Sequence, residues 1–353
     1  MNGPFIAKNA MNGPFMARAG KSVARAKYAR RMALDLSAAP SVRAHRGRGT
    51  ALILLASVLS GTSGPLGKPA MTAGLSPEQV AAARITIAAL ILLIGVALVK
   101  PALLKVKPGE WRFLAAYGLI GVAGVQLTYF VAASRLPVGV AILLEFTSPV
   151  LIAFWVRFAR KVRLPGLMWL GIALAMAGLA LVAQVWQGLR LDGIGLLAGL
   201  GAAVCSAVYF LLGEHGVATR HPLGMVTWGM VIGAVAVCAL APPWTLPASV
   251  LTAPADFGRW HPPVWTLLVA LALLPTVFAY ITGITALQYV SASVASVLGL
   301  LEPVVTTVTA WLLLGETLTW IQLTGAVILL TGASIVQLNS PDRQVGLVSV
   351  ATG

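Results

Sequence analysis

Apolar runs of about 20 residues follow one another along most of the chain, from residue 49 to residue 338. A helix of about 20 apolar residues spans the hydrocarbon core of a bilayer. These runs are apolar on every side, whereas a helix on the surface of a soluble protein has one apolar and one polar face. Only 10% of the residues are charged and the mean hydropathy is +0.89, while soluble domains carry about 25% charged residues. The pattern therefore predicts an all-α membrane protein with many spans.

The apolar runs predict ten transmembrane helices and two tails. We expect the helices at residues 49–67, 78–99, 113–133, 138–158, 165–184, 194–213, 223–242, 264–283, 292–313 and 319–338. Helices 1–5 form a first repeat at 49–184, helices 6–10 a second repeat at 194–338, and the tails are residues 1–48 and 339–353. The first tail is basic, begins with the duplicated pattern "MNGPF", offers Met11 and Met32 as alternative starts, and is expected to be disordered.

The distribution of Lys and Arg predicts the orientation, because cytoplasmic loops carry an excess of these residues. With the N-terminus inside, the inner loops include basic segments such as "RFARKVR" (157–163), and both termini are cytoplasmic. The outer loops then hold four cationic residues, Lys68, Arg135, Arg190 and Arg259. The net charge of +15 could indicate a nucleic-acid partner, but no basic module with interleaved aromatic residues follows the tail. The bilayer is therefore the expected partner, and nucleic acid is not.

The two halves of the chain are related by an offset of 154 residues. Pro149 then falls on Pro303, Gly171 on Gly325 and Gly178 on Gly332. Because each half has five helices, an odd number, the second half would enter the membrane upside down. Inverted repeats with broken helices are typical of secondary transporters.

Glu145 lies inside the fourth predicted helix, in "LLEFTSPVLIAFW" (143–155), four residues before Pro149. A charge at the centre of a helix costs about 2.5–3.5 kcal/mol on insertion scales. Pro149 has no N–H, so the carbonyl of Glu145 loses its helical partner. A carboxyl group beside a free carbonyl suits a substrate ammonium or a proton. The alternative is a protonated glutamate that hydrogen-bonds to a neighbouring helix, with Pro149 acting as a kink.

Glu302 lies directly before Pro303 in the ninth predicted helix, near the midplane of the bilayer. The repeat places Glu302 opposite Ser148 and Glu145 opposite Gly299, so the two acids are not symmetry mates. Two acids in different settings could divide substrate binding and proton coupling between them. The alternative for Glu302 is a packing hydrogen bond at the break.

Arg84 lies inside the second predicted helix, at nearly the depth of Glu145. Three interpretations remain open: an ion pair with Glu145, a cavity-facing guanidinium that binds a substrate carboxylate, or a side chain that reaches the outer headgroups. Eight further residues could line a cavity, and their alternative role is helix packing. They are Gln126, Tyr129, Tyr209 and Tyr280, together with Ser57, Ser60, Thr128 and Ser206.

Two segments resemble a known family. "LLEPVVTTVTAWLLLGETLTWIQLTGAVILLTGASIV" (300–336) is similar to the C-terminal half-motif of the EamA-type branch of the drug/metabolite transporter superfamily. "RLPVGVAILLEFTSPVLIAF" (135–154) resembles the bacterial threonine/homoserine exporter subgroup more closely. The resemblance covers about residues 50–338. It implies a carrier with ten helices in the cytoplasmic (inner) membrane of a bacterium, which exports small metabolites such as amino acids.

The sequence also argues against other classes of protein. The motifs GxxxxGK[ST], HExxH and GxSxG do not occur, and Cys205 and Cys238 show no metal-ligand spacing. We therefore expect no metal, no cofactor and no enzyme activity. The expected function is secondary transport by alternating access, with helix breaks at Pro149 and Pro303 and with a small molecule, and protons if they are coupled, as partners. The alternatives are efflux of drugs or nucleotide-related metabolites, or a non-transporting membrane enzyme or receptor; a homodimer is open.

Overall fold

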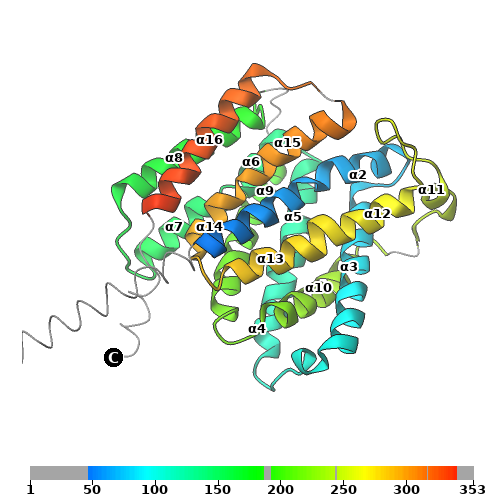
Figure 1. Ribbon diagram of the computed structural model, residues 1–353, viewed down its shortest axis with the longest axis horizontal. Coiled ribbons are helices and arrows are strands. Elements are labelled where there is room, and N and C mark those ends of the chain that lie inside the picture. Colours follow the sequence, from blue (N-terminus) through cyan, green and yellow to red (C-terminus); the bar gives the residue numbers. More distant parts are fainter. Residues whose placement is uncertain (1–46, 187–191, 243–244, 316, 340–353) are drawn as a thin grey trace, which may run out of the picture. The chain divides into compact units, whose positions relative to one another are not determined.

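The computed structural model describes residues 47–186, 192–242, 245–315 and 317–339 (Figure 1). Most of both predicted tails, together with Arg190 in an expected outer loop, lies outside this part of the chain. The chain divides into two units, Met1–Gly47 and Arg48–Gly353, and all described residues after Gly47 belong to the second. Within the described ranges the structure is helical, apart from two isolated β-bridges in one loop, Pro254 with Pro263 and Phe257 with Trp260.

The helical elements follow the predicted runs closely. After helical residues 47–61 come α2 (Ser63–Thr72), α3 (Pro77–Val99), the short η1 (Pro101–Leu104), α4 (Trp111–Ala116), η2 (Tyr117–Gly124), α5 (Val125–Ala133), α6 (Val138–Glu145), α7 (Ser148–Phe158) and α8 (Gly166–Val182). The second half has α9 (Gly193–Gly216), α10 (Pro222–Cys238), α11 (Ala248–Thr252), α12 (Val264–Ala272), η4 (Leu273–Phe278), α13 (Ala279–Ala286), α14 (Ala292–Gly299), α15 (Leu301–Leu314) and α16 (Trp320–Asn339).

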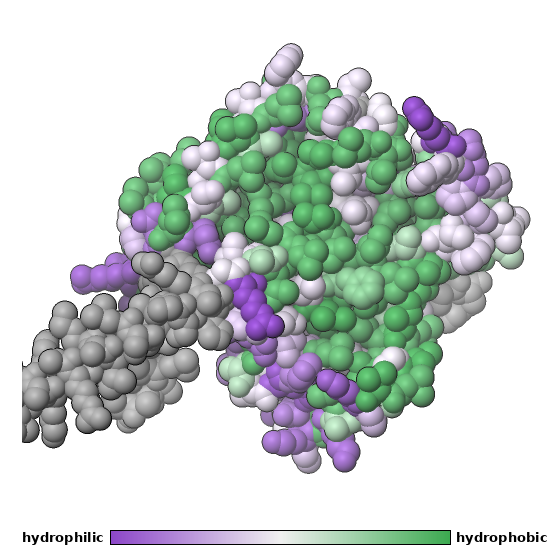
Figure 2. Space-filling model, viewed as in Figure 1, coloured by the Kyte–Doolittle hydropathy of each residue, from purple (hydrophilic) through white to green (hydrophobic). Residues whose placement is uncertain are grey.

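Eight segments of the described chain are long and apolar enough to cross a membrane. They are Gly47–Thr72, Pro77–Val99, Trp111–Ala133, Gly139–Phe158, Gly193–Gly216, Val264–Ala286, Ala292–Leu314 and Trp320–Asn339. Two further apolar helices, α8 and α10, have 17 residues each. Figure 2 shows apolar side chains over the visible helices, with hydrophilic residues gathered near α4 and near α11. The protein is therefore an all-helical, multi-pass membrane protein.

Local sequence explains where several helices begin and end. Ser76 and Gln79 form a capping box at the start of α3, with Pro77 at the first helical position. The side chain of Asp192 accepts a hydrogen bond from the Gly195 N–H at the start of α9 (2.7 Å). At the other end of a helix, α15 stops at Gly315, whose φ of 69° is left-handed.

Three of the helices are broken shortly before a proline. The fourth predicted helix divides at residues 146–147, the ninth at Leu300, and the first at Thr62. In each case the proline lies in the first turn of the following segment, where its missing N–H is tolerated. These prolines are Pro149 in α7, Pro303 in α15 and Pro65 in α2. The discontinuities thus precede the prolines by a few residues.

Carbonyl groups that lose a partner to proline find hydroxyl donors. Pro65 cannot donate to the Gly61 carbonyl, which accepts a hydrogen bond from Thr309 Oγ1 at 3.1 Å. Pro275 likewise cannot donate to the Leu271 carbonyl, which accepts one from Thr276 Oγ1 at 2.9 Å. Such replacement is needed because the hydrocarbon core offers no water to an unpaired carbonyl.

The helical elements of the two halves correspond at the offset found in the sequence. Adding 154 to the bounds of α6 gives 292 and 299, which are the bounds of α14. The π-helical segments η2 and η4 also fall on each other over residues 119–124 and 273–278. The same local distortions therefore occur at equivalent places in both halves.

The helices α8 and α16 pack closely through their glycines. They lie side by side in Figure 1, and a Cβ added to Gly171 would lie 2.8 Å from the Gly332 carbonyl oxygen. A Cβ added to Gly325 would lie 2.8 Å from the Gly178 carbonyl oxygen. Because the numbering runs in opposite directions along the two helices, α8 and α16 are antiparallel. The offset of 154 residues relates Gly171 to Gly325 and Gly178 to Gly332. The contact between Gly171 and Gly332 is therefore the repeat equivalent of the contact between Gly325 and Gly178.

We expect Gly178→Val to destabilise the protein, because the added side chain would overlap the backbone of α16 around Leu329. Overpacking a tight contact costs about 1–3 kcal/mol or more. The measurement is the melting temperature in detergent, followed by size-exclusion chromatography. Gly95→Val is the matched control, since a Cβ at Gly95 in α3 meets no atom within 4 Å. Equal melting temperatures for the two variants would contradict the close contact.

Candidate functional site

A central cavity of about 700 Å³ lies among the broken helices. Its size is within the range of about 300–1,000 Å³ that is usual for small-molecule sites. Seven of the residues that the sequence singled out line it: Arg84, Gln126, Tyr129, Glu145, Tyr209, Tyr280 and Glu302. They come from α3, α5, α6, α9, α13 and α15, so residues from both halves meet there. Of the two break prolines, Pro303 is also part of the lining.

The guanidinium of Arg84 lies at this cavity and is only partly satisfied. Its Nη1 donates a hydrogen bond to Ser63 Oγ at 2.9 Å, while Nε is buried with no partner among the described residues. In the same part of the chain no ion pair within 4.0 Å joins Arg84 to Glu145 or Glu302. Of the three interpretations from the sequence, this geometry agrees with the cavity-facing one.

Glu145 and Glu302 sit at the two helix breaks. Glu145 is the last residue of α6 and Glu302 the second residue of α15. Pro149 withholds a hydrogen bond from the Glu145 carbonyl, and Pro303 withholds one from the Gly299 carbonyl. Gly299, the repeat equivalent of Glu145, also lines the cavity. Glu302 lies close enough to Glu145 for their charges to interact, and Arg84 lies close enough to interact with both glutamates.

Aromatic rings form one wall of the site. The ring of Tyr209 stacks on that of Tyr117 with centroids 5.6 Å apart, and meets the Tyr280 ring edge-on at 5.7 Å. Tyr117 is fully buried behind this wall. Rings packed in this way are stiff, because each fixes its neighbour's orientation. The wall thus offers a substrate a fixed surface.

Hydroxyl groups surround the breaks. Ser206 Oγ donates to Ser148 Oγ at 3.1 Å, and Thr306 Oγ1 donates to the Glu302 carbonyl at 3.0 Å. Sequence reasoning gave no role to Ser63 or Thr306. The signals that could have found them are the "GTSGP" break at residues 61–65 and the threonine-rich turns after Pro303.

Two ion pairs join helix ends on the side where the predicted inner loops meet. Arg160 Nη1 bonds to Glu214 Oε2 at 2.5 Å, and Glu214 Oε1 accepts the Ala292 N–H at 3.2 Å. Glu214 therefore links the loop after α7 and the first residue of α14 to α9. Arg220 Nη1 bonds to Glu110 Oε2 at 2.5 Å and ties the loop before α10 to the start of α4.

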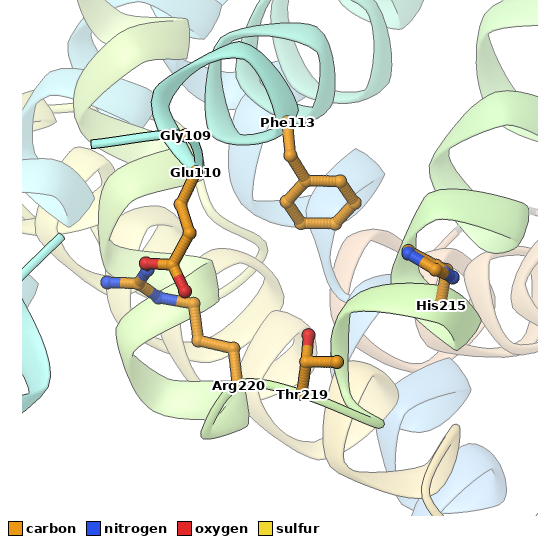
Figure 3. A pocket seen from close by; sticks show the side chains of 6 residues that line it. All are labelled: Gly109, Glu110, Phe113, His215, Thr219 and Arg220. Atoms are coloured by element: carbon orange, nitrogen blue, oxygen red, sulfur yellow. The ribbon is translucent and has the colours of Figure 1, made fainter. Parts of the chain in front are cut away.

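A smaller pocket of about 200 Å³ lies beside the second ion pair (Figure 3). In this view the side chains of Glu110 and Arg220 meet, and Phe113 faces His215 with ring centroids 5.9 Å apart. The central cavity extends the other way, since Pro77, Gly139 and Gln322 line it close to the starts of α3, α6 and α16. The two ion pairs thus lie at the opposite helix ends from these three lining residues.

The sequence model of the EamA-like transporter family matches the chain twice, at residues 47–184 and 193–338. The chain belongs to the EamA-like transporter family. The resemblance first noted in residues 300–336 is thereby confirmed. The double match assigns each half of the chain to the same family module.

Relatives and a solved structure agree with this assignment. The threonine/homoserine exporter RhtA of Salmonella typhimurium (strain SL1344) is 30% identical over 77% of this chain and 84% of its own length. RhtA of Escherichia coli (strain K12) is 29% identical over 78% and 87%. YyaM of Bacillus subtilis (strain 168), an uncharacterized transporter, is 30% identical over 73% and 83%. A crystal structure at 20% identity superposes with a TM-score of 0.65 and covers 82% of this chain and 97% of its own, which supports the fold.

We expect the Glu110–Arg220 ion pair to make stability depend on pH in the acid range. A backbone hydrogen bond from Lys107 and the charge of Arg220 hold the pKa of Glu110 below its usual value of 4.5. A depressed folded-state pKa stabilises the protein above the unfolded value, and this contribution is lost as pH falls through the folded pKa. Melting temperatures of wild type and Glu110→Gln should therefore differ at pH 6 and converge as the pH falls below 4.5 and through the lowered pKa of Glu110. A constant difference across that window would contradict this account.

Proposed function

We propose that this protein exports amino acids by alternating access, with threonine and homoserine as the first candidates. The observation that carries the proposal is the charge pattern of the central cavity, where one guanidinium and two carboxyl groups face a common space. An amino acid carries one carboxylate and one ammonium, so Arg84 and one glutamate complement it. The names of the RhtA relatives supply the two candidate substrates.

Each charged group has a role in this proposal. Arg84 binds the substrate carboxylate through two parallel N–H···O bonds. Glu145 binds the ammonium with its carboxylate and with the carbonyl that Pro149 leaves free. Glu302 supplies the second carboxyl group, and Gln126, Tyr129, Tyr209 and Tyr280 shape the remaining space.

A proton gradient can drive export through the same groups. A glutamate that binds an ammonium must be ionised, so a proton and the substrate compete for it. A proton arriving from outside would release the amino acid there, and loss of that proton inside would restore the site. In this cycle one amino acid leaves the cell as one proton enters, which is proton antiport.

The architecture proposed for this cycle has ten spans, with α8 and α10 as the two shorter ones, arranged as inverted repeats at 49–184 and 194–338. The glycine contacts of α8 and α16 support the inverted arrangement. These two helices hold equivalent places in the two halves, they are antiparallel, and their contacts are reciprocal, as a two-fold axis between the halves would produce. Both termini would be cytoplasmic and the membrane would be the bacterial inner membrane. The ion-paired end would then be the closed cytoplasmic side.

The volume of the cavity favours a second candidate function. About 700 Å³ lies well inside the range usual for drug-sized ligands, about 300–1,000 Å³. Efflux of larger amphipathic metabolites through the same cavity is therefore the alternative. A panel that includes aromatic amino acids, nucleosides and cationic drugs distinguishes the two.

The test is efflux from proteoliposomes loaded with labelled amino acids, with and without an imposed pH gradient. We expect saturable export of threonine or homoserine, accelerated when the outside is acidic. Glu145→Gln should lower the rate at least 10-fold, because the neutral amide gives up the charge-assisted bond to the ammonium. Glu302→Gln should change the response to the pH gradient.

Glu78→Gln is the matched control, since Glu78 lies exposed in the first turn of α3. It should transport like the wild type. The amino-acid proposal is wrong if wild-type protein moves none of the amino acids. Full activity of Glu145→Gln on every substrate would show that Glu145 has a packing role.

A further inference from the structure

We infer that Ser63 is a positioning residue that holds the Arg84 guanidinium in place to recognise a carboxylate. The Ser63–Arg84 pair thereby makes the transporter select substrates that carry a carboxylate group. This inference rests on the proposed function. It adds the group that orients Arg84 and the substrate feature that the pair selects.

The contact between the two side chains is direct. Arg84 Nη1 donates to Ser63 Oγ at 2.9 Å, and both residues line the central cavity. A long arginine side chain has many rotamers, and a fixed acceptor at one nitrogen restricts them. The hydroxyl of Ser63 is neutral, so it orients the guanidinium and leaves its positive charge for a ligand.

The break in the first helix gives Ser63 its position. The first helical segment ends at residue 61, and α2 begins at Ser63. One turn residue, Thr62, with φ −76° and ψ −8°, separates the two segments, so that Ser63 lies in the first turn of α2. Pro65 in that turn prevents the helix from closing across the break.

Packing against α15 holds the break in place. Thr309 Oγ1 donates to the Gly61 carbonyl at 3.1 Å, and a Cβ added to Gly64 would lie 2.9 Å from Thr306 Cγ2. The break therefore packs against the turns of α15 that directly follow Glu302. A shift of α15 during transport would move Ser63, and with it Arg84.

The remaining donors of Arg84 point to a ligand. A guanidinium has five N–H donors, and Nε is buried without a partner among the described residues. An unsatisfied buried donor is costly. A carboxylate matches the planar fork of the guanidinium and would satisfy Nε and one terminal nitrogen together. An amine lacking the carboxylate would leave these donors unpaired.

The experiment compares two substrates that differ only in the carboxylate. Threonine and its decarboxylated form, 1-amino-2-propanol, are each measured for KM and maximal rate in proteoliposomes. Wild type should have a much lower KM for threonine. We expect Ser63→Ala to raise the KM for threonine about 10-fold, to leave that for the amine within about twofold, and to keep the maximal rate. Ser63→Thr, which retains the hydroxyl, should keep the KM for threonine as low as in the wild type.

Controls separate orientation from folding. Thr62→Val removes a hydroxyl at the same break that bonds to the Leu59 carbonyl instead of Arg84, so it should leave the selectivity unchanged. If Ser63→Ala does not accumulate in the membrane, Ser63→Cys tests the same loss of an oxygen acceptor with nearly the same volume. Arg84→Lys should lose the preference for threonine, and adding Ser63→Ala to it should have no further effect on selectivity.

The outcomes distinguish this inference from the proposed function. Equal rises in KM for both substrates, or unchanged selectivity in the Ser63 variants, would overturn the positioning role while amino-acid export stands. Failure of wild-type protein to transport threonine or any other amino acid would overturn the proposed function itself, before any variant is compared.

Discussion

The requirement that every backbone carbonyl find a partner in the hydrocarbon core governs this structure. Proline removes such partners at the three breaks, so the broken helices have to lie where other side chains or a water-filled space can replace them. Thr309 does this for Gly61 by a direct hydrogen bond. The carbonyls of Glu145 and Gly299 instead belong to residues that line the central cavity. The helix breaks and the cavity therefore occur together, because unpaired carbonyls need a polar space. The charged residues Arg84, Glu145 and Glu302 lie at the cavity because a charge facing lipid would also be unsolvated.

The helices α8 and α16 are unbroken and pack directly against each other, unlike the interrupted helices around the cavity. Their glycines bring two backbones into contact, with no charged residue between Gly166 and Val182 or between Trp320 and Asn339. At this seam the two backbones leave no room for a larger side chain at the four glycines, so small residues are required there. The structure therefore combines one closely packed seam with three helices that are interrupted at Thr62, at residues 146–147 and at Leu300.

The sequence predicted the helices and the residues of the cavity because both depend on local signals. Apolar runs predicted the bounds of the helices to within a few residues, and eight segments of the described chain are long and apolar enough to cross a membrane. A charged side chain inside an apolar helix is costly in lipid, so it usually faces a cavity, as Arg84, Glu145 and Glu302 do. The partners could not be predicted in the same way. The bonds of Arg84 to Ser63, Arg160 to Glu214 and Arg220 to Glu110 join residues that are 21, 54 and 110 positions apart in the sequence. Which partners meet depends on the packing of the whole chain. The breaks were placed at the prolines, although each lies a few residues earlier.

The two halves are alike at the glycine seam and different at the cavity, where Glu145 is the repeat equivalent of Gly299 and Ser148 is that of Glu302. If identical halves exchanged roles in a transport cycle, the inward-facing and outward-facing sites would be the same site seen from two sides, with equal affinity for the substrate. Unequal placement of the acids removes that equality. In the proposed cycle the protein would then hold its cargo more tightly on one side of the membrane than on the other, and at a given driving force this difference would shift the concentration at which each direction of transport saturates.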